Sequence, residues 1–323
     1  MQPEIAISRN LMQDTQLPWL FGGLLGVLGF ASIVGAILAR TVRDETARQT
    51  VANLNLRIRS WWVMCATFAL AILTRGFGTT LFFALVSLLA LREFVALTPA
   101  RPSDHRALVM CFFVFLPLQY YLLRVARYDA FTTLIPTVAF FLVPISSALK
   151  GDTEAFLERV AKIQWGLLLC IYCVSYVPAL LMLQIPHYEG QDAKLMLVLV
   201  VVDQICDVLQ YIVGQLVGWH KILPLVSPQK TWEGFLGGVG GATVIGAALW
   251  WATPFAPWQA ALLSLVIALM GFVGGVIMSA IKRDHGLKDY GTLIPGHGGV
   301  LDRIDSLCFA APVFFHLTRH FFT

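Results

Sequence analysis

Long apolar stretches alternate with short polar segments along most of this sequence. A helix that crosses the hydrocarbon core of a membrane needs about 20 mostly apolar residues, with a range of roughly 17–25. Ten stretches approach this length and predict helices, centred on residues 18–39, 60–74, 77–91, 107–123, 130–148, 164–184, 195–217, 235–252, 259–281 and 304–318. The second, third and tenth are short, so the pattern predicts an all-α, polytopic bundle of 9–10 transmembrane helices.

The composition supports the same fold class. Hydrophobic residues make up 58% of the chain and charged residues 13%, and the mean hydropathy is +0.73. Soluble domains are roughly 45–50% apolar and ~25% charged. The chain is therefore expected to be an integral membrane protein. The net charge of +4 does not indicate nucleic-acid binding, because the sequence contains no nucleic-acid-binding module.

The distribution of Lys and Arg predicts the orientation, because these residues collect in cytoplasmic loops. With ten spans and the N-terminus outside, most of the 23 Lys and Arg residues fall in five cytoplasmic segments: 40–59, 92–106, 149–163, 218–234 and 282–303. Residues 1–16 lack the positive start of a signal peptide, so the first apolar stretch is expected to remain as an anchor. We therefore predict a multi-pass protein of the cell (inner) membrane.

The polar segments divide the chain into two regions. Residues 1–190 are expected to form transmembrane helices without an assignable site. Residues 191–323 are expected to form a catalytic transmembrane region with cytoplasmic polar loops at 218–234 and 282–303.

The first polar region begins inside an apolar helix. Asp203 and Asp207 lie four residues apart and therefore on one helix face. A carboxylate within the membrane costs about 2.5–3.5 kcal/mol, so these two either line a hydrated site or are neutral and hydrogen-bonded. The following loop brings a cation, two hydroxyls and an acid close together at Ser227, Lys230, Thr231 and Glu233. Alternatively, Thr231 caps a helix with Glu233 in its first turn.

The second polar region mixes cations, acids and glycines. Lys282, Arg283, Lys288 and Arg303 are interleaved with Asp284, Asp289, Asp302 and Asp305. Gly296, Gly298 and Gly299 allow backbone N–H groups to approach an anion. Asp302 and Asp305 are three residues apart and can direct their carboxylates at one Mg2+ ion. Alternatively, Asp302 caps the last helix and Asp305 is an acid in its first turn. His297 could bond phosphate or satisfy its own loop.

These segments resemble the signature of the phosphatidate cytidylyltransferase (CDP-diacylglycerol synthase) family. That signature can be written Ser-x2-Lys-Arg-x4-Lys-Asp-x5-Pro-Gly-His-Gly-Gly-x2-Asp-Arg-x-Asp. All thirteen of its fixed positions are present, from Ser279, Lys282, Arg283, Lys288, Asp289, Pro295 and Gly296 through His297, Gly298, Gly299, Asp302 and Arg303 to Asp305. A second family stretch is matched at Asp207, Tyr211, Gly214, Ser227, Pro228, Lys230, Thr231, Glu233 and Gly234.

The resemblance implies a metal-dependent transfer of CMP from CTP to phosphatidate, giving CDP-diacylglycerol and pyrophosphate. It implies Mg2+ as cofactor, with Mn2+ or a second cation as alternatives. The expected partners are CTP, phosphatidate, membrane lipids and a second copy of the chain in a homodimer, with the active site facing the cytoplasm. The expected catalytic residues are Lys282, Arg283, Lys288, Asp289 and Asp302; the metal ligands are Asp207, Asp302 and Asp305; and the substrate-binding residues are Ser227, Lys230, Thr231, Glu233, Ser279, His297, Gly298, Gly299 and Arg303.

One position departs from the family pattern. Family members commonly carry Gly-Asp with the Asp four residues before the signature Ser, and this chain has Gly274-Gly275 there. The missing carboxylate leaves three alternatives: a weakly active enzyme, a regulatory homologue, or an enzyme for a different lipid phosphate. An ion-coupled transporter is a further alternative, because carboxylates inside a membrane also mark ion pathways.

Overall fold

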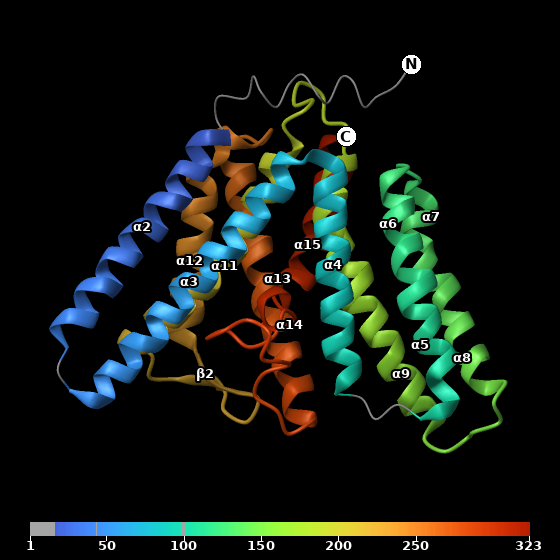
Figure 1. The fold of residues 1–323 in the computed structure, drawn as a ribbon. Helices are drawn as coiled ribbons and strands as arrows, with labels where there is room; N and C mark the ends of the chain where they lie inside the picture. The colour runs from blue at the N-terminus through green and yellow to red at the C-terminus, as the bar shows by residue number, and fades with distance from the viewer. Residues whose placement is uncertain (1–16, 43, 98–100) are drawn as a thin grey trace.

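The apolar stretches form helices that stand side by side in one bundle, seen in a computed structural model that describes residues 17–42, 44–97 and 101–323 (Figure 1). A helix bonds every backbone group within its own segment, which a membrane interior requires. Eight helices in the described residues are long and apolar enough to cross a membrane. Three are uninterrupted at the start of the chain: α2 (Leu17–Thr41), α3 (Glu45–Leu73) and α4 (Arg75–Ala96).

Each of three further spans is interrupted by a short π-helical segment, whose turns are wider than those of an α-helix. The first joins η1 (Pro102–Asp104), α5 (His105–Met110), η2 (Cys111–Phe115) and α6 (Leu116–Arg124). The second joins α7 (Tyr128–Thr133), η3 (Leu134–Ala139) and α8 (Phe140–Ala148), and the third joins α9 (Phe156–Leu167), η4 (Leu168–Cys173), α10 (Val174–Ala179) and η5 (Leu180–Met182). The π-type turns η2, η3 and η4 each contain or precede a proline, which cannot donate the regular helical bond.

The C-terminal part holds the two longest uninterrupted apolar helices of that region, α11 (Asp192–Val217) and α13 (Pro257–Asp284). Between them lie the antiparallel strands β1 (Lys221–Leu223) and β2 (Ser227–Thr231), then α12 (Trp232–Ala248) and η6 (Trp250–Ala252). The chain ends with α14 (Leu301–Ile304) and α15 (Leu307–Phe322). The stretches predicted at 235–252 and 304–318 are thus helical, but α12 and α15 have only 17 and 16 residues. The all-α membrane bundle is confirmed, but eight helices in the described residues, rather than nine or ten, are long and apolar enough to cross a membrane.

Glycine lets α12 lie very close to α11. A Cβ atom on Gly238 would come within 2.9 Å of the Cys206 carbonyl oxygen, and one on Gly234 within 2.7 Å of the Gln210 carbonyl oxygen. Both distances are shorter than side-chain carbon atoms tolerate. Small residues at a helix interface are a common way to pack helices within membranes. The strand-to-helix segment that carries Thr231 is therefore held firmly against α11.

The polar loops predicted to be cytoplasmic all lie at one end of the bundle. In Figure 1 the α2–α3 turn, the β1–β2 hairpin, the loop before α14 and the loop after α8 are at the bottom, while α2 begins and α15 ends at the top. The relative placement of these loops agrees with the Lys and Arg pattern, and the side of the membrane stays a prediction. The segment 1–16 lies outside the described residues.

Candidate active site

The glycine-rich signature folds into a tight turn between α13 and α14. Ile294 pairs with Gly298 in an isolated β-bridge, in which the Ile294 N–H donates to the Gly298 carbonyl at 2.8 Å. Gly296 and Gly298 have φ values of +76° and +87°, which favour glycine because a Cβ atom is strained there. The turn holds His297 at its tip, and the sequence could indicate the turn but not what holds it.

Two helices of the N-terminal region hold this turn. Arg57 Nε donates to the Gly296 carbonyl at 3.1 Å, and Ser60 Oγ donates to the Pro295 carbonyl at 2.7 Å, both from α3. From α4, the Glu93 carboxylate accepts the backbone N–H groups of Val300 and Leu301 at 3.0 and 2.8 Å. Those N–H groups begin α14 and have no partner within the helix.

Arg57, Ser60 and Glu93 were missed by the sequence analysis, which assigned no site to residues 1–190. The signal for Glu93 was an acid within an apolar helix, because such an acid needs a partner. Arg57 and Ser60 gave no distinct signal. The assignment of catalysis to residues 191–323 stays a prediction. The signature loop of that region is positioned by α3 and α4, which belong to residues 1–190.

Asp302 is at the centre of the folded signature and is 5% exposed. Its Oδ2 accepts the backbone N–H groups of Tyr290 at 2.8 Å and Gly299 at 2.9 Å. Its Oδ1 lies 3.0 Å from Lys282 Nζ. Asp302 lies inside α14 rather than at its N-cap, so the simple capping alternative does not describe it. The carboxylate ties the loop to the end of α13 through charge-assisted hydrogen bonds.

A second group of acids lies beside Asp302. Asp305 Oδ2 is 3.6 Å from Lys282 Nζ, and the Ser306 hydroxyl donates to Asp203 Oδ2 at 2.8 Å while also interacting with Asp207. The prediction that Asp203 and Asp207 share a helix face is thus confirmed. Asp203 is 1% exposed and accepts two hydrogen bonds, which favours the hydrogen-bonded interpretation for this residue. Asp207 is half-buried, close enough to Asp305 and Lys230 for electrostatic interaction.

The first polar loop is shaped by its own capping bonds. The Thr231 hydroxyl accepts the Gly234 N–H at 3.1 Å, so Thr231 is the N-cap of α12. Glu233 turns back to the preceding loop, accepting the N–H groups of Trp219 and His220 and pairing with His220 Nδ1 at 2.6 Å. The bond with His220 lowers the pKa of Glu233 to about 2. Capping is confirmed, and substrate contacts by Ser227, Thr231 and Glu233 stay predictions.

The two polar regions meet at this end of the bundle. Arg283 Nε donates to the Val226 carbonyl at 3.4 Å, joining the signature to the β1–β2 hairpin. Lys230 lies with its Nζ 4.5 Å from the centre of the Phe272 ring on α13. A Cβ atom on Gly275 would come within 2.9 Å of the same Nζ. The ammonium of Lys230 therefore occupies the space beside Gly275, where the family commonly has a carboxylate.

Two groups in the signature are buried without a partner. Arg303 Nε and His297 Nδ1 are inaccessible and form no hydrogen bond with the described chain. The His297 ring contacts Trp61 edge-to-face, with 6.2 Å between ring centres. Burial and the nearby Arg303 lower the pKa of His297 to about 4, so the imidazole is neutral at pH 7. An unpaired buried donor such as Arg303 Nε costs about 1–3 kcal/mol.

Other predicted residues lie at the edge of this cluster. Lys288 and Asp289 are exposed and form no ion pair with the described residues. Ser279 donates to the Gly275 carbonyl of its own helix at 2.6 Å. Gly298 and Gly299 lie against the carboxylates of Asp302 and Glu93. Their predicted roles in catalysis and substrate binding are not decided by these contacts.

The acids fit a metal site with few protein ligands better than one with three or more. No three or more His, Cys, Asp or Glu side chains in the described part of the chain are arranged to hold a metal ion. Mg2+ commonly needs only one or two protein carboxylates, with phosphates and waters completing its octahedron. Asp207 and Asp305 fit this set, since Asp305 is 3.6 Å from its nearest cation and no ion pair engages Asp207 among the described residues. Asp302 can act as a metal ligand only if the ammonium of Lys282 moves away from Asp302 Oδ1.

Comparison with known proteins identifies a family and several relatives. The sequence matches the Cytidylyltransferase family over residues 55–321. It is 40% identical over 292 residues to the uncharacterized protein YnbB of Escherichia coli (strain K12), covering 89% of this chain and 95% of that protein.

Named enzymes match over a shorter region. A phosphatidate cytidylyltransferase of Staphylococcus saprophyticus is 35% identical over 147 residues, covering 45% of this chain and 56% of that protein. One of Mycobacterium leprae is 44% identical over 108 residues, covering 33% and 35%. The family match extends from α3 through α15 and includes both polar regions, so the chain belongs to the cytidylyltransferase family.

Proposed function

We propose that this protein transfers CMP from CTP to phosphatidate at the site formed by the two polar regions. The observation that carries the proposal is the meeting of these regions. Arg283 contacts Val226, Lys230 lies beside Gly275, and the unpaired Nε of Arg303 is buried nearby. Two anionic substrates need several cations in one place, and this end of the bundle supplies them.

The reaction is a substitution at phosphorus. An oxygen of the phosphatidate phosphate attacks the α-phosphorus of CTP, the new P–O bond forms, and the bond from that phosphorus to the bridging oxygen breaks, releasing pyrophosphate. Such reactions depend on positioning and on neutralising charge along the phosphates. Arg303 and Lys230 are assigned to bind phosphate oxygens, and Lys282 to hold Asp302 and Asp305 in place.

Mg2+ would be held by Asp207 and Asp305, and when bound it would neutralise phosphate charge. Asp302 would support this pair indirectly by fixing the loop through Tyr290 and Gly299. Lipid phosphates other than phosphatidate are a second candidate class of acceptor. Gly275 favours this alternative, because the carboxylate missing at this position removes negative charge beside Lys230 and so changes the charge next to the acceptor.

A lipid-extraction assay tests the proposal. Purified protein in detergent is incubated with Mg2+, phosphatidate and CTP radiolabelled at the α-phosphate, and the organic phase is counted. We expect label in the lipid phase, and none when the γ-phosphate carries the label. Arg303→Gln should lower the rate at least about tenfold, as loss of a charged hydrogen bond worth about 1.5–3 kcal/mol predicts. Arg106→Gln, an exposed cation on α5, is the matched control and should retain the rate.

The same assay with other lipid phosphates separates the alternatives. Label that enters only another lipid phosphate would retain the transferase chemistry and change the acceptor. No transfer to any lipid by a well-folded protein would leave a regulatory homologue or a transporter as the better account.

A further inference from the structure

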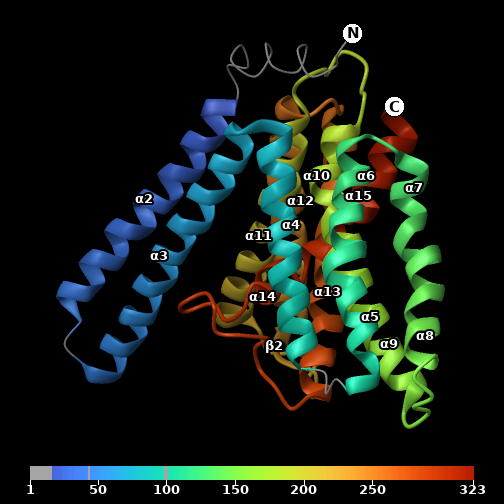
Figure 2. The ribbon, with the colours of Figure 1, turned by 45° about the vertical axis from the view of Figure 1, so that its right-hand side comes forward.

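An open groove lies between α2 and α3, apart from the site described above. It has a volume of about 420 Å3, and its lining includes Leu38 of α2, Val42 directly after α2, and Arg48, Val51, Asn55 and Arg59 of α3. Figures 1 and 2 show that these two helices lean away from the rest of the bundle toward the end that carries the polar loops. The groove therefore opens sideways, where lipid surrounds a membrane protein.

The α3 wall of the groove carries a polar stripe beside the apolar residues Val51, Ala52 and Leu56. Arg48, Asn55 and Arg59 are spaced by seven and four residues and lie on one face of the helix. Both arginines are exposed, and neither guanidinium group forms an ion pair or a hydrogen bond with the described part of the chain. Asn55 Nδ2 donates to the Gly35 carbonyl at 3.3 Å, which joins the two helices and sets the width of the groove.

The α2 wall is apolar. Leu38, Ala39 and Val42 face the arginine stripe, and no carboxylate is among the described residues that line the groove. A pair of guanidinium groups suits a phosphate, because each presents several N–H donors in a planar fork. The apolar wall suits an acyl chain that continues from the headgroup. The apolar wall would not contact a free nucleotide favourably, whereas a phospholipid contacts the arginines with its headgroup and the apolar wall with an acyl chain.

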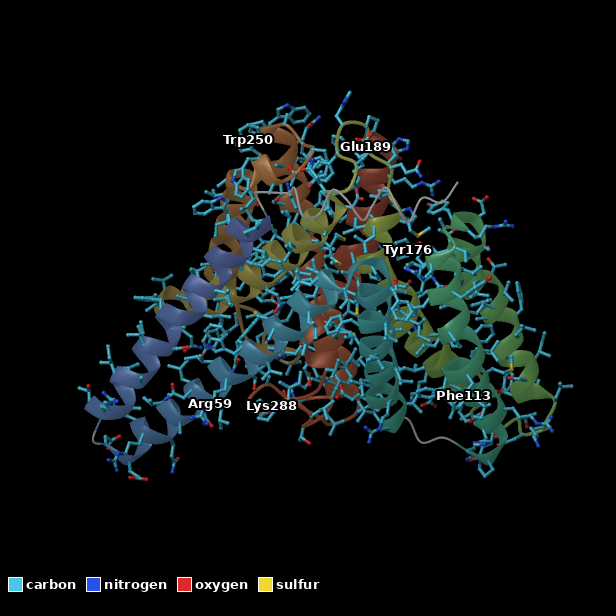
Figure 3. The ribbon with its side chains drawn as sticks, turned by 45° about the horizontal axis from the view of Figure 1, so that its top comes forward. Arg59, Phe113, Tyr176, Glu189, Trp250 and Lys288 are labelled. Atoms are coloured by element: carbon cyan, nitrogen blue, oxygen red, sulfur yellow. The ribbon has the colours of Figure 1, made fainter. Side chains whose placement is uncertain are left out.

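The groove is also tied to the signature turn. The helix that carries Arg48 and Arg59 contacts the turn through Arg57 and Ser60 on another face. Arg59 and Lys288 are both labelled in the lower part of Figure 3, toward the end of the bundle that holds the polar loops. This is where anionic lipid headgroups meet a juxtamembrane cation, an interaction worth about 1 kcal/mol for each Lys or Arg.

We propose that the α2–α3 groove binds an anionic phospholipid, with Arg48 and Arg59 attracting its phosphate and an acyl chain along Leu38 and Val42. The two arginines recognise the headgroup, and Asn55 keeps the helices at the required spacing. This binding does not depend on the proposed transferase activity, because none of the groove residues belongs to that site.

The test uses dioleoylphosphatidylglycerol, whose phosphodiester makes it distinct from the proposed acceptor. The full-length protein in detergent is titrated with this lipid, with dioleoylphosphatidylcholine or with inorganic phosphate, and bound lipid is counted by native mass spectrometry. We expect binding of phosphatidylglycerol to exceed that of phosphatidylcholine. The double variant Arg48→Gln/Arg59→Gln should weaken it by at least about tenfold, from the loss of two interactions of about 1 kcal/mol.

Three further variants isolate the groove. Arg40→Gln removes an exposed cation of α2 that does not line the groove and should retain binding. Ala52→Phe fills the groove while keeping both arginines and should lose binding. Lys282→Ala, in the proposed transferase site, should also retain binding, so failure of one proposal is distinguishable from failure of the other.

Several outcomes would overturn the inference. Equal binding by the double arginine variant and the unmodified protein excludes the stripe as the headgroup site. Inorganic phosphate that displaces the lipid completely, or binding that survives Ala52→Phe, excludes the apolar wall. A groove covered by a second copy of the chain would appear as a dimer that Ala52→Phe dissociates without any change in bound lipid.

Discussion

At the residue scale, Asp302 shows how one side chain serves both the loop and the charge balance of the site. It accepts three hydrogen bonds while 5% exposed, one of them from Lys282. Asp302→Asn keeps an oxygen for the backbone donors but leaves Lys282 with Asp305 alone. We expect turnover to fall by orders of magnitude and the melting temperature to fall with it, because a charge-assisted bond worth about 1.5–3 kcal/mol is weakened.

The measurement is the lipid-extraction rate together with thermal unfolding in detergent. Asp289→Asn, at an exposed position of the same loop, is the control for stability and should melt as the unmodified protein does. A normal rate in Asp302→Asn would exclude a role of its charge in the reaction.

Gly275 tests whether the missing carboxylate matters. A side chain at this position would point at Lys230 Nζ, 2.9 Å from the new Cβ, and the flexible lysine can move. Gly275→Asp should therefore be tolerated and should lower the Mg2+ concentration for half-maximal activity, because it adds a carboxylate oxygen beside the proposed metal site. Gly275→Ala moves Lys230 without adding charge and should not have this effect. An unchanged Mg2+ dependence in an active Gly275→Asp protein would contradict the missing-ligand hypothesis.

His297 predicts a dependence of stability on pH. Its pKa is about 4 in the folded protein and near 6.5 when unfolded, so below pH 6.5 the unfolded chain binds the additional proton. Stability should then fall as the pH is lowered from about 6.5 to about 4 and change little above that window. Melting temperatures across this range should show a smaller slope in His297→Gln. An identical slope in both proteins would assign the dependence to other groups.

At the scale of elements, α4 is a support for the signature and not merely a membrane span. Glu93 accepts the first two free N–H groups of α14. Glu93→Gln keeps one acceptor and loses the charge, which should cost about 1.5–3 kcal/mol of stability and lower turnover without direct contact to substrate. Thermal unfolding and initial rates are the measurements. Arg92→Gln, the exposed neighbour, should change neither.

At the scale of the whole molecule, the arrangement of loops predicts a single cytoplasmic face. Lys230→Cys and Arg283→Cys should react with a membrane-impermeant thiol reagent from the same side, and Glu189→Cys from the other. Figure 3 shows Glu189 and Trp250 at the end opposite Lys288. The native cysteines are mostly buried, so the unmodified protein supplies the background. Labelling of positions 230 and 283 from opposite sides would exclude both the topology and a shared site.

The sequence by itself determined the membrane environment, the helices and the family, but not the β1–β2 hairpin. Apolar stretches near the length of a membrane span must form helices, since backbone groups have no other partner in lipid. The signature from Ser279 to Asp305 determined the family, because its spacing is legible without any folded contact. The ten predicted stretches are all helical, although α12 and α15 are shorter than a full span.

Only the tertiary structure decided which residues hold the site together. The contacts of Arg57 and Glu93 with the signature join positions separated by 239 and 207 residues, and no local pattern encodes such a separation. The same holds for Lys230, whose position beside Gly275 depends on how closely α12 and its strand pack on α11 and α13. Periodicity reports which face of a helix is buried, whereas the partner on that face is set by three-dimensional packing.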